Sequence, residues 1–96
     1  MIEVAIVDDR QIVRTGFREL LSEDAGIGVS FEAGSGDEAL ALLQTRPCDV
    51  LLLDISLPDR NGVDVLRTVR QRHADVMVLI LSGFPEEGYA LSMIRN

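Results

Sequence analysis

Residues 48–62 read CDVLLLDISLPDRNG, and within them an uninterrupted apolar run, Val50 to Leu53, ends on a single carboxylate, Asp54. A strand without alternating polar residues needs both of its faces covered, which is typical of an interior strand in a parallel sheet flanked by helices. Pro58 and the Asn61-Gly62 pair then predict a loop. Because open parallel sheets bind their ligands at the carboxyl ends of the strands, Asp54 lies where chemistry is expected.

Length and composition describe one small globular domain. The chain has 96 residues, 47% of them hydrophobic and 26% charged, which is far from the composition of disordered proteins. The formal net charge of −7 argues against direct contact with nucleic acid, because phosphate binding depends on clustered cations. All nine basic side chains are arginines, so a role that requires a lysine has no residue to fill it.

Nothing in the sequence indicates secretion or membrane insertion. The single cysteine, Cys48, cannot form an internal disulfide, and the first residues lack a basic segment followed by an apolar signal core. The longest apolar run, residues 76–81, is far shorter than the roughly 20 residues of a membrane helix. We therefore expect a soluble protein in a reducing cytoplasm, without a membrane partner.

Strand and helix patterns alternate along the chain. Besides the central strand, apolar strands are expected over residues 3–7, 29–33 and 76–81. Helices are expected over 11–21, from an N-cap at Ser35 to a residue before Pro47, over 63–72, and from Pro85 onward. The strand at 29–33 alternates apolar and polar residues and is expected at an edge. This order predicts an α/β fold with a parallel sheet, in a flavodoxin-like, three-layer αβα arrangement.

The helices are expected to turn particular apolar residues inward. For the helix over residues 11–21 these are Ile12, Val13, Phe17, Leu20 and Leu21. Gly16 costs that helix about 1 kcal/mol relative to alanine, which close packing on the sheet would explain. For the helix over residues 63–72 the inward set is Val63, Leu66 and Val69. The last helix carries Tyr89, Ala90, Met93 and Ile94.

Three strands end on oxygen-bearing side chains: Asp8 and Asp9 follow the first, Asp54 ends the third and Ser82 follows the fourth. In a flavodoxin-like strand order these ends are neighbours. Crowded carboxylates raise one another's pKa unless a cation is supplied, and Mg²⁺ prefers such oxygen ligands. We expect Mg²⁺ to be held by Asp9, Asp54 and a main-chain carbonyl, with Ser56 as the candidate.

The chemistry that such a site favours is phosphoryl transfer to Asp54, because an ionised carboxylate is a nucleophile that needs no general base. The Ser82 hydroxyl is expected to hydrogen-bond the transferred group. Simpler roles remain open: Asp8 caps the following helix, and Ser82 forms a turn. Arg10 either reaches the mouth of the site or is solvated, and we favour the solvated alternative.

These motifs together resemble the receiver domain of bacterial two-component response regulators, from Glu3 to the end of the chain. The residues that carry the resemblance are Asp8-Asp9, Asp54, Ser56-Leu57-Pro58, Asn61-Gly62 and Ser82-Gly83. Three segments are most similar to receivers that precede a LuxR-type helix-turn-helix domain: Val7-Asp8-Asp9, Leu53 to Pro58, and Glu87-Gly88-Tyr89-Ala90-Leu91.

The resemblance implies a signalling role rather than enzymatic turnover of a substrate. It implies that Asp54 accepts phosphate from a sensor histidine kinase and that Asp8 and Asp9 arrange Mg²⁺. It also implies that Ser82 is the switch hydroxyl and that the signal passes to a DNA-binding output domain outside this chain. Beyond its own phosphorylation and dephosphorylation, no catalysis is expected.

The chain departs from the family pattern in two respects. Arg10-Gln11 stands where this subgroup commonly has His-Pro. The family also continues with a fifth strand bearing a phosphate-pairing lysine, and with a fifth helix, and this chain has neither. We therefore expect residues 1–96 to be a C-terminally incomplete receiver domain with impaired phosphorylation. The fourth strand would then have an open edge that invites homodimerisation or domain swapping.

Two other functions compete with the signalling role. One is a receiver-like interaction module that is not phosphorylated. The other is a phosphatase with an aspartyl nucleophile, as in haloacid-dehalogenase-like enzymes. Those enzymes carry a second aspartate two residues after the first, and here that position is Ser56, so we disfavour this alternative.

Overall fold

A sheet with the strand order β2-β1-β3-β4-β5 forms the centre of the computed structural model, which describes residues 1–59, 61–82 and 90–94. The first four strands are parallel, and β5 is antiparallel to β4. In chain order the elements are β1 (Ile2–Val7), α1 (Gln11–Leu21), β2 (Ile27–Ala33), α2 (Gly36–Leu43), β3 (Val50–Asp54), α3 (Gly62–Arg72), β4 (Met77–Ser82) and β5 (Ala90–Ile94). The parallel four-stranded part with its three helices confirms the predicted flavodoxin-like α/β fold.

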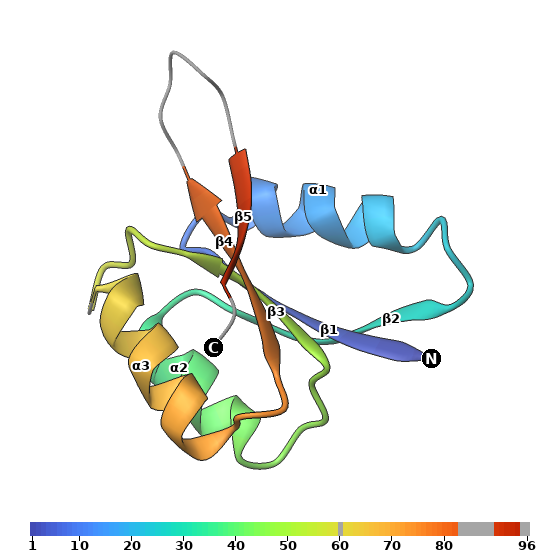
Figure 1. The fold of residues 1–96 in the computed structure, drawn as a ribbon. Coiled ribbons are helices and arrows are strands. Elements are labelled where there is room, and N and C mark those ends of the chain that lie inside the picture. The colour runs from blue at the N-terminus through green and yellow to red at the C-terminus, as the bar shows by residue number, and fades with distance from the viewer. Residues whose placement is uncertain (60, 83–89, 95–96) are drawn as a thin grey trace.

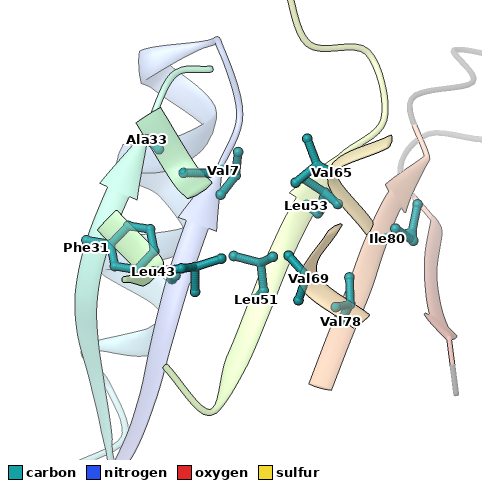
Figure 2. Packing of buried hydrophobic residues seen from close by; sticks show 12 residues of the cluster. Val7, Phe31, Ala33, Leu43, Leu51, Leu53, Val65, Val69, Val78 and Ile80 are labelled. Carbon is teal, nitrogen blue, oxygen red and sulfur yellow. The ribbon is translucent and has the colours of Figure 1, made fainter. Parts of the chain in front are cut away.

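Helices cover both faces of this sheet, with α1 on one side and α2 and α3 on the other (Figure 1). Strand β3 lies between them, and its residues alternate between two apolar clusters as the pleat requires. Leu51 and Leu53 are fully buried in the cluster that includes Val65 and Val69 of α3 (Figure 2). Leu52 packs on the opposite face with Ile6 and Phe17. The prediction that both faces of the central strand are covered is confirmed.

The inward faces of two helices differ from the prediction. On α1, Ile12 is 81% and Leu20 is 65% exposed, so the helix packs through a narrower stripe that includes Phe17. On α3, Val63 is exposed while Val65 is fully buried. A helix that lies across a twisted sheet touches it only along part of its apolar arc, and periodicity alone does not tell which part.

No helix in the described part of the chain is both long and apolar enough to cross a membrane.

Gly16 is not a close-packing residue, contrary to the prediction. A Cβ atom built on it meets no heavy atom within 4 Å, so the position is open. We expect Gly16→Ala to stabilise the protein by about 0.5–1 kcal/mol, since alanine removes the entropic cost of glycine in a helix. Chemical unfolding in urea will measure this gain. A loss of stability would instead reveal a packing constraint at this position.

Residues 90–94 form strand β5 rather than the predicted helix. They pair antiparallel with β4 over five registered positions, from Ser82↔Ala90 to Val78↔Ile94. A strand edge offers a row of backbone N–H and C=O groups, whereas a single helical turn forms few bonds for the residues it orders. Pairing with β4 therefore competes successfully with the helix. The predicted start of that helix, residues 85–89, lies outside the described residues.

The same pairing corrects a second expectation. The outer edge of β4 is occupied by β5, so the premise for homodimerisation or swapping through an exposed fourth strand is wrong. In contrast, β2 lies at the opposite edge of the sheet, as its alternating pattern predicted.

Candidate functional site

Three aspartates from two neighbouring strands meet at one rim of the sheet. Strands β1 and β3 are parallel partners with Val7 opposite Leu53, so the residues that follow each strand emerge side by side. One carboxylate oxygen from each of Asp8, Asp9 and Asp54 lies within 4.8 Å of the other two. The prediction that the acidic pair and the central aspartate share one end of the sheet is confirmed.

The three carboxylates differ in exposure. Asp8 is fully buried, Asp54 is 6% exposed, and Asp9 faces solvent. Burial raises the pKa of Asp54, and the negative charges of Asp8 and Asp9 raise it further. The Ser56 N–H, which donates to Asp54 Oδ1 at 3.1 Å, and the charge of Arg10 both oppose that rise. The ionised form of Asp54 therefore carries a free-energy cost, and a cation in the site would relieve it.

Arg10 lies across the acidic cluster, and the prediction that it is simply solvated is wrong. Its Nε donates to Asp8 Oδ1 at 3.0 Å and its Nη2 donates to Asp8 Oδ2 at 2.9 Å. Its backbone N–H also donates to Asp8 Oδ1, at 2.8 Å. The same Nη2 lies 3.9 Å from Asp54 Oδ2. Arg10 therefore contributes positive charge to the place where the aspartates crowd.

The end of β1 is fixed by side chains from α1. Arg14 Nη1 donates to the backbone carbonyl of Asp8 at 2.7 Å, and its Nε donates to Glu32 on β2 at 3.3 Å. Arg18 also donates to Glu32, at 2.6 Å. These bonds connect α1 to the two strands beside the site. This network was not predictable from the sequence, because it depends on the register between β1 and β2 and on the position of α1.

The loop after Asp54 is closed at its base and attached to a neighbouring helix. Gly62 N donates to the Ile55 carbonyl at 2.8 Å. Further along, the Asp59 carboxylate accepts from the N–H groups of Gly36 and Asp37 at the start of α2, both at 2.8 Å. Anions are favoured at helix N-termini, so Asp59 helps to cap α2. Ser35, the predicted N-cap, also accepts from Glu38 N at 3.2 Å.

Ser56 and Ser82 occupy different places relative to the cluster. Ser56 is exposed and lines a pocket together with Asp9, Arg10 and Asp54. Ser82 ends β4, one residue past Leu81, which is the partner of Asp54 in the sheet. The backbone of Ser82 is thus at the same rim, while its side chain lies outside the described part of the chain.

The donor set of this site suits a hard divalent cation. The three aspartates supply only oxygen ligands, and no histidine or cysteine joins them in the acidic group found among the described residues. Carboxylate and carbonyl oxygens favour Mg²⁺ and Ca²⁺, whereas zinc and copper sites usually include nitrogen or sulfur ligands. The pocket beside Asp9, Asp54 and Ser56 gives such an ion access from solvent.

Sequence comparison relates this chain to known proteins. Residues 4–96 match the family described as "Response regulator receiver domain". The chain is 34% identical over 95 residues to the transcriptional regulatory protein DegU of Brevibacillus brevis, covering 99% of this chain and 40% of that protein. It is 38% identical over 94 residues to the DNA-binding transcriptional activator DevR/DosR of Mycobacterium tuberculosis, covering 98% and 43% respectively. The chain thus spans about two fifths of the length of these relatives.

Solved structures support the same fold. The non-phosphorylated receiver domain of the stress response regulator RcsB from Escherichia coli superposes with a TM-score of 0.82 at 22% identity. The superposition covers 90% of this chain and 68% of that one.

Proposed function

This chain belongs to the response regulator receiver domain family, and from that premise we propose that it receives a phosphoryl group on Asp54 with the help of Mg²⁺. The observation that carries the proposal is the meeting of Asp8, Asp9 and Asp54 within 4.8 Å at the carboxyl ends of two strands. Asp8, Asp9, Asp54 and the main-chain carbonyl of Ser56 are the proposed ligands.

Asp54 presents its two oxygens differently. Oδ1 accepts the Ser56 N–H, so we assign Oδ2, on the side of Arg10, as the nucleophile. In the transfer, Asp54 Oδ2 forms a bond to phosphorus while the bond between phosphorus and the donor breaks. For a kinase phosphohistidine the leaving group is the imidazole nitrogen, which keeps the electron pair of the broken bond. Bound Mg²⁺ would neutralise the phosphoryl oxygens as charge shifts in the transition state.

The remaining roles follow from the same proposal. A sensor histidine kinase supplies the phosphoryl group, and the Ser82 hydroxyl contacts it after transfer. DegU and DevR/DosR are by name transcriptional regulators, and DevR/DosR is a DNA-binding one. We infer that this domain controls a DNA-binding output outside the 96 residues. Its own net charge of −7 makes it a poor DNA ligand, and a cytoplasmic location suits both proposed partners.

Labelling with a small phosphoryl donor tests the proposal. We expect the intact mass to increase by one phosphoryl group in Mg²⁺, slowly because the chain has no lysine to pair with the phosphate. The adduct should be acid-stable and base-labile, and EDTA should prevent labelling. Asp9→Ala removes a direct ligand, so it should weaken Mg²⁺ binding by at least the roughly 10- to 100-fold that the loss of an outer-shell partner costs, measured by calorimetry, and slow labelling accordingly. Asp64→Ala, on the exposed side of α3, is the matched control. Labelling that proceeds equally well without a divalent ion would contradict the proposal.

The two competing functions make different predictions for the same site. A phosphatase would turn over a chromogenic phosphate ester steadily, whereas a phosphoacceptor accumulates at most one phosphoryl group per chain. An interaction module that is not phosphorylated has no need to hold Mg²⁺. Tight Mg²⁺ binding that is lost in Asp9→Ala would therefore argue against that module.

A further inference from the structure

Both oxygens of Asp8 are engaged by one side chain. Asp8 Oδ1 accepts from Arg10 Nε at 3.0 Å and Oδ2 accepts from Arg10 Nη2 at 2.9 Å, which is the forked geometry of a bidentate arginine–carboxylate pair. The Asp8 side chain is 0% exposed. Among the described residues no buried side-chain nitrogen or oxygen lacks a hydrogen-bond partner, and for Asp8 the partner is Arg10.

The Arg10 guanidinium also faces the phosphoacceptor. Its Nη2 lies 3.9 Å from Asp54 Oδ2, and the side chain lines the same pocket as Asp9, Asp54 and Ser56. The side-chain hydrogen bonds to Asp8 raise the pKa of Arg10, and the negative charges of Asp8, Asp54 and Asp9 raise it further. A delocalised positive charge therefore sits between two of the carboxylates that would surround a divalent ion.

Arg14 does not share this position. Its Nη1 donates to the backbone carbonyl of Asp8 and its Nε to Glu32, so its bonds are compatible with an ion on the carboxylates. Arg10 differs because the atoms it binds are carboxylate oxygens of the acidic group itself. A cation that takes an oxygen of Asp8 has to compete with that fork.

We propose that Arg10 is a tethered counter-ion that Mg²⁺ displaces from Asp8. The inference rests on the proposed function of the site and adds that Arg10 and Mg²⁺ compete for Asp8. Without a divalent ion, the guanidinium balances Asp8 and partly balances Asp54. When the ion binds, the fork opens and the guanidinium leaves Asp8.

Metal affinity tests the competition. Calorimetry with Mg²⁺ and with Mn²⁺ should find about tenfold tighter binding in Arg10→Gln, which keeps a polar side chain but removes the charge and the fork. The metal affinity of Arg10→Lys should lie between those of the unaltered protein and Arg10→Gln, since a lysine point charge cannot hold both oxygens of Asp8. Arg67→Gln, on the exposed side of α3, should bind as the unaltered protein does. Equal or weaker binding in Arg10→Gln, or unaltered affinity in Arg10→Lys, overturns the proposal.

A direct readout does not depend on the variants folding well. In ¹⁵N-labelled protein the Arg10 Nε–Hε resonance should shift and exchange faster with water as Mg²⁺ is added, because its bond to Asp8 is broken. A resonance that stays unchanged at saturating Mg²⁺ overturns the displacement. If Asp54 is labelled in a Mg²⁺-dependent way while the Arg10 Nε–Hε resonance stays unchanged, only this inference fails. If neither the unaltered protein nor Arg10→Gln binds a divalent ion, the proposed function fails as well.

Discussion

Asp54→Asn is expected to abolish phosphoryl labelling completely while leaving the protein folded and more stable near neutral pH. The amide has no anionic oxygen to form the bond to phosphorus. Its carbonyl oxygen can still accept the Ser56 N–H that Asp54 Oδ1 accepts at 3.1 Å, so the start of the loop keeps its hydrogen bond. Intact-mass analysis after treatment with donor and Mg²⁺ measures the loss.

The gain in stability follows from the sign of the pKa shift. Burial, with Asp8 and Asp9, raises the pKa of Asp54 in the folded protein above the value of the unfolded chain. The folded protein therefore binds the Asp54 proton more tightly than the unfolded chain does. As pH rises from the unfolded pKa of Asp54 to its higher folded pKa, the free energy of unfolding falls, because the stability contributed by protonated Asp54 is lost. Above that window Asp54→Asn should raise the free energy of unfolding. Below it the two proteins should be equally stable.

Urea unfolding at neutral and acidic pH checks this expectation. Asp64→Asn is the matched control, because Asp64 is exposed on α3 and its charge lies outside the acidic group. Labelling that survives in Asp54→Asn would refute the phosphoacceptor assignment. If Asp54→Asn is instead less stable than its parent at neutral pH, the contacts of ionised Asp54 stabilise the fold by more than the burial of its charge costs.

Gly62→Ala is expected to be the most damaging small substitution at the site. Gly62 is buried, and a Cβ there would lie 2.6 Å from Ile55 Cα, 2.8 Å from the Asp54 carbonyl oxygen and 3.0 Å from the Ile55 carbonyl oxygen. All three atoms belong to backbone, which cannot rotate away as a side chain can. The bond from Gly62 N to the Ile55 carbonyl, at 2.8 Å, would be pushed apart. We expect a loss of about 2–3 kcal/mol in unfolding free energy.

The same substitution should impair function, because the displaced backbone is that of the phosphoacceptor. Labelling of the folded fraction should slow, and the effect should persist at saturating Mg²⁺. Gly16→Ala is the matched control, since it adds the same methyl group where there is open space. Parental stability and labelling in Gly62→Ala would mean that the loop can shift without cost.

The position of the acidic site was predictable from the sequence for a simple physical reason. Apolar runs mark the strands, parallel strands end at one rim, and the flavodoxin-like strand order makes the first and third strands neighbours. Asp8, Asp9 and Asp54 follow or end these two strands. The N-cap at Ser35 was equally local, since it depends on residues only three positions apart.

Arg10 and β5 were not predictable in this way. Whether a long side chain at a strand end turns to solvent or folds back on Asp8 depends on its rotamers and on the burial of its partner. Residues 90–94 have apolar positions compatible with either a helix or a strand, and the free edge of β4 decided between them. The exposure of Ile12 on α1 is a third case, because it depends on where the helix lies over the sheet.

The antiparallel pairing of β5 has a consequence for any longer form of this protein. The outer side of β4 has a single row of backbone donors and acceptors, and residues 90–94 use it. A parallel strand that joins the sheet beside β4 would have to displace β5. Pairing of β4 with β5 and pairing of β4 with such a strand are therefore mutually exclusive. In a longer polypeptide, an added parallel strand and β5 would compete for the same row of backbone hydrogen bonds on β4.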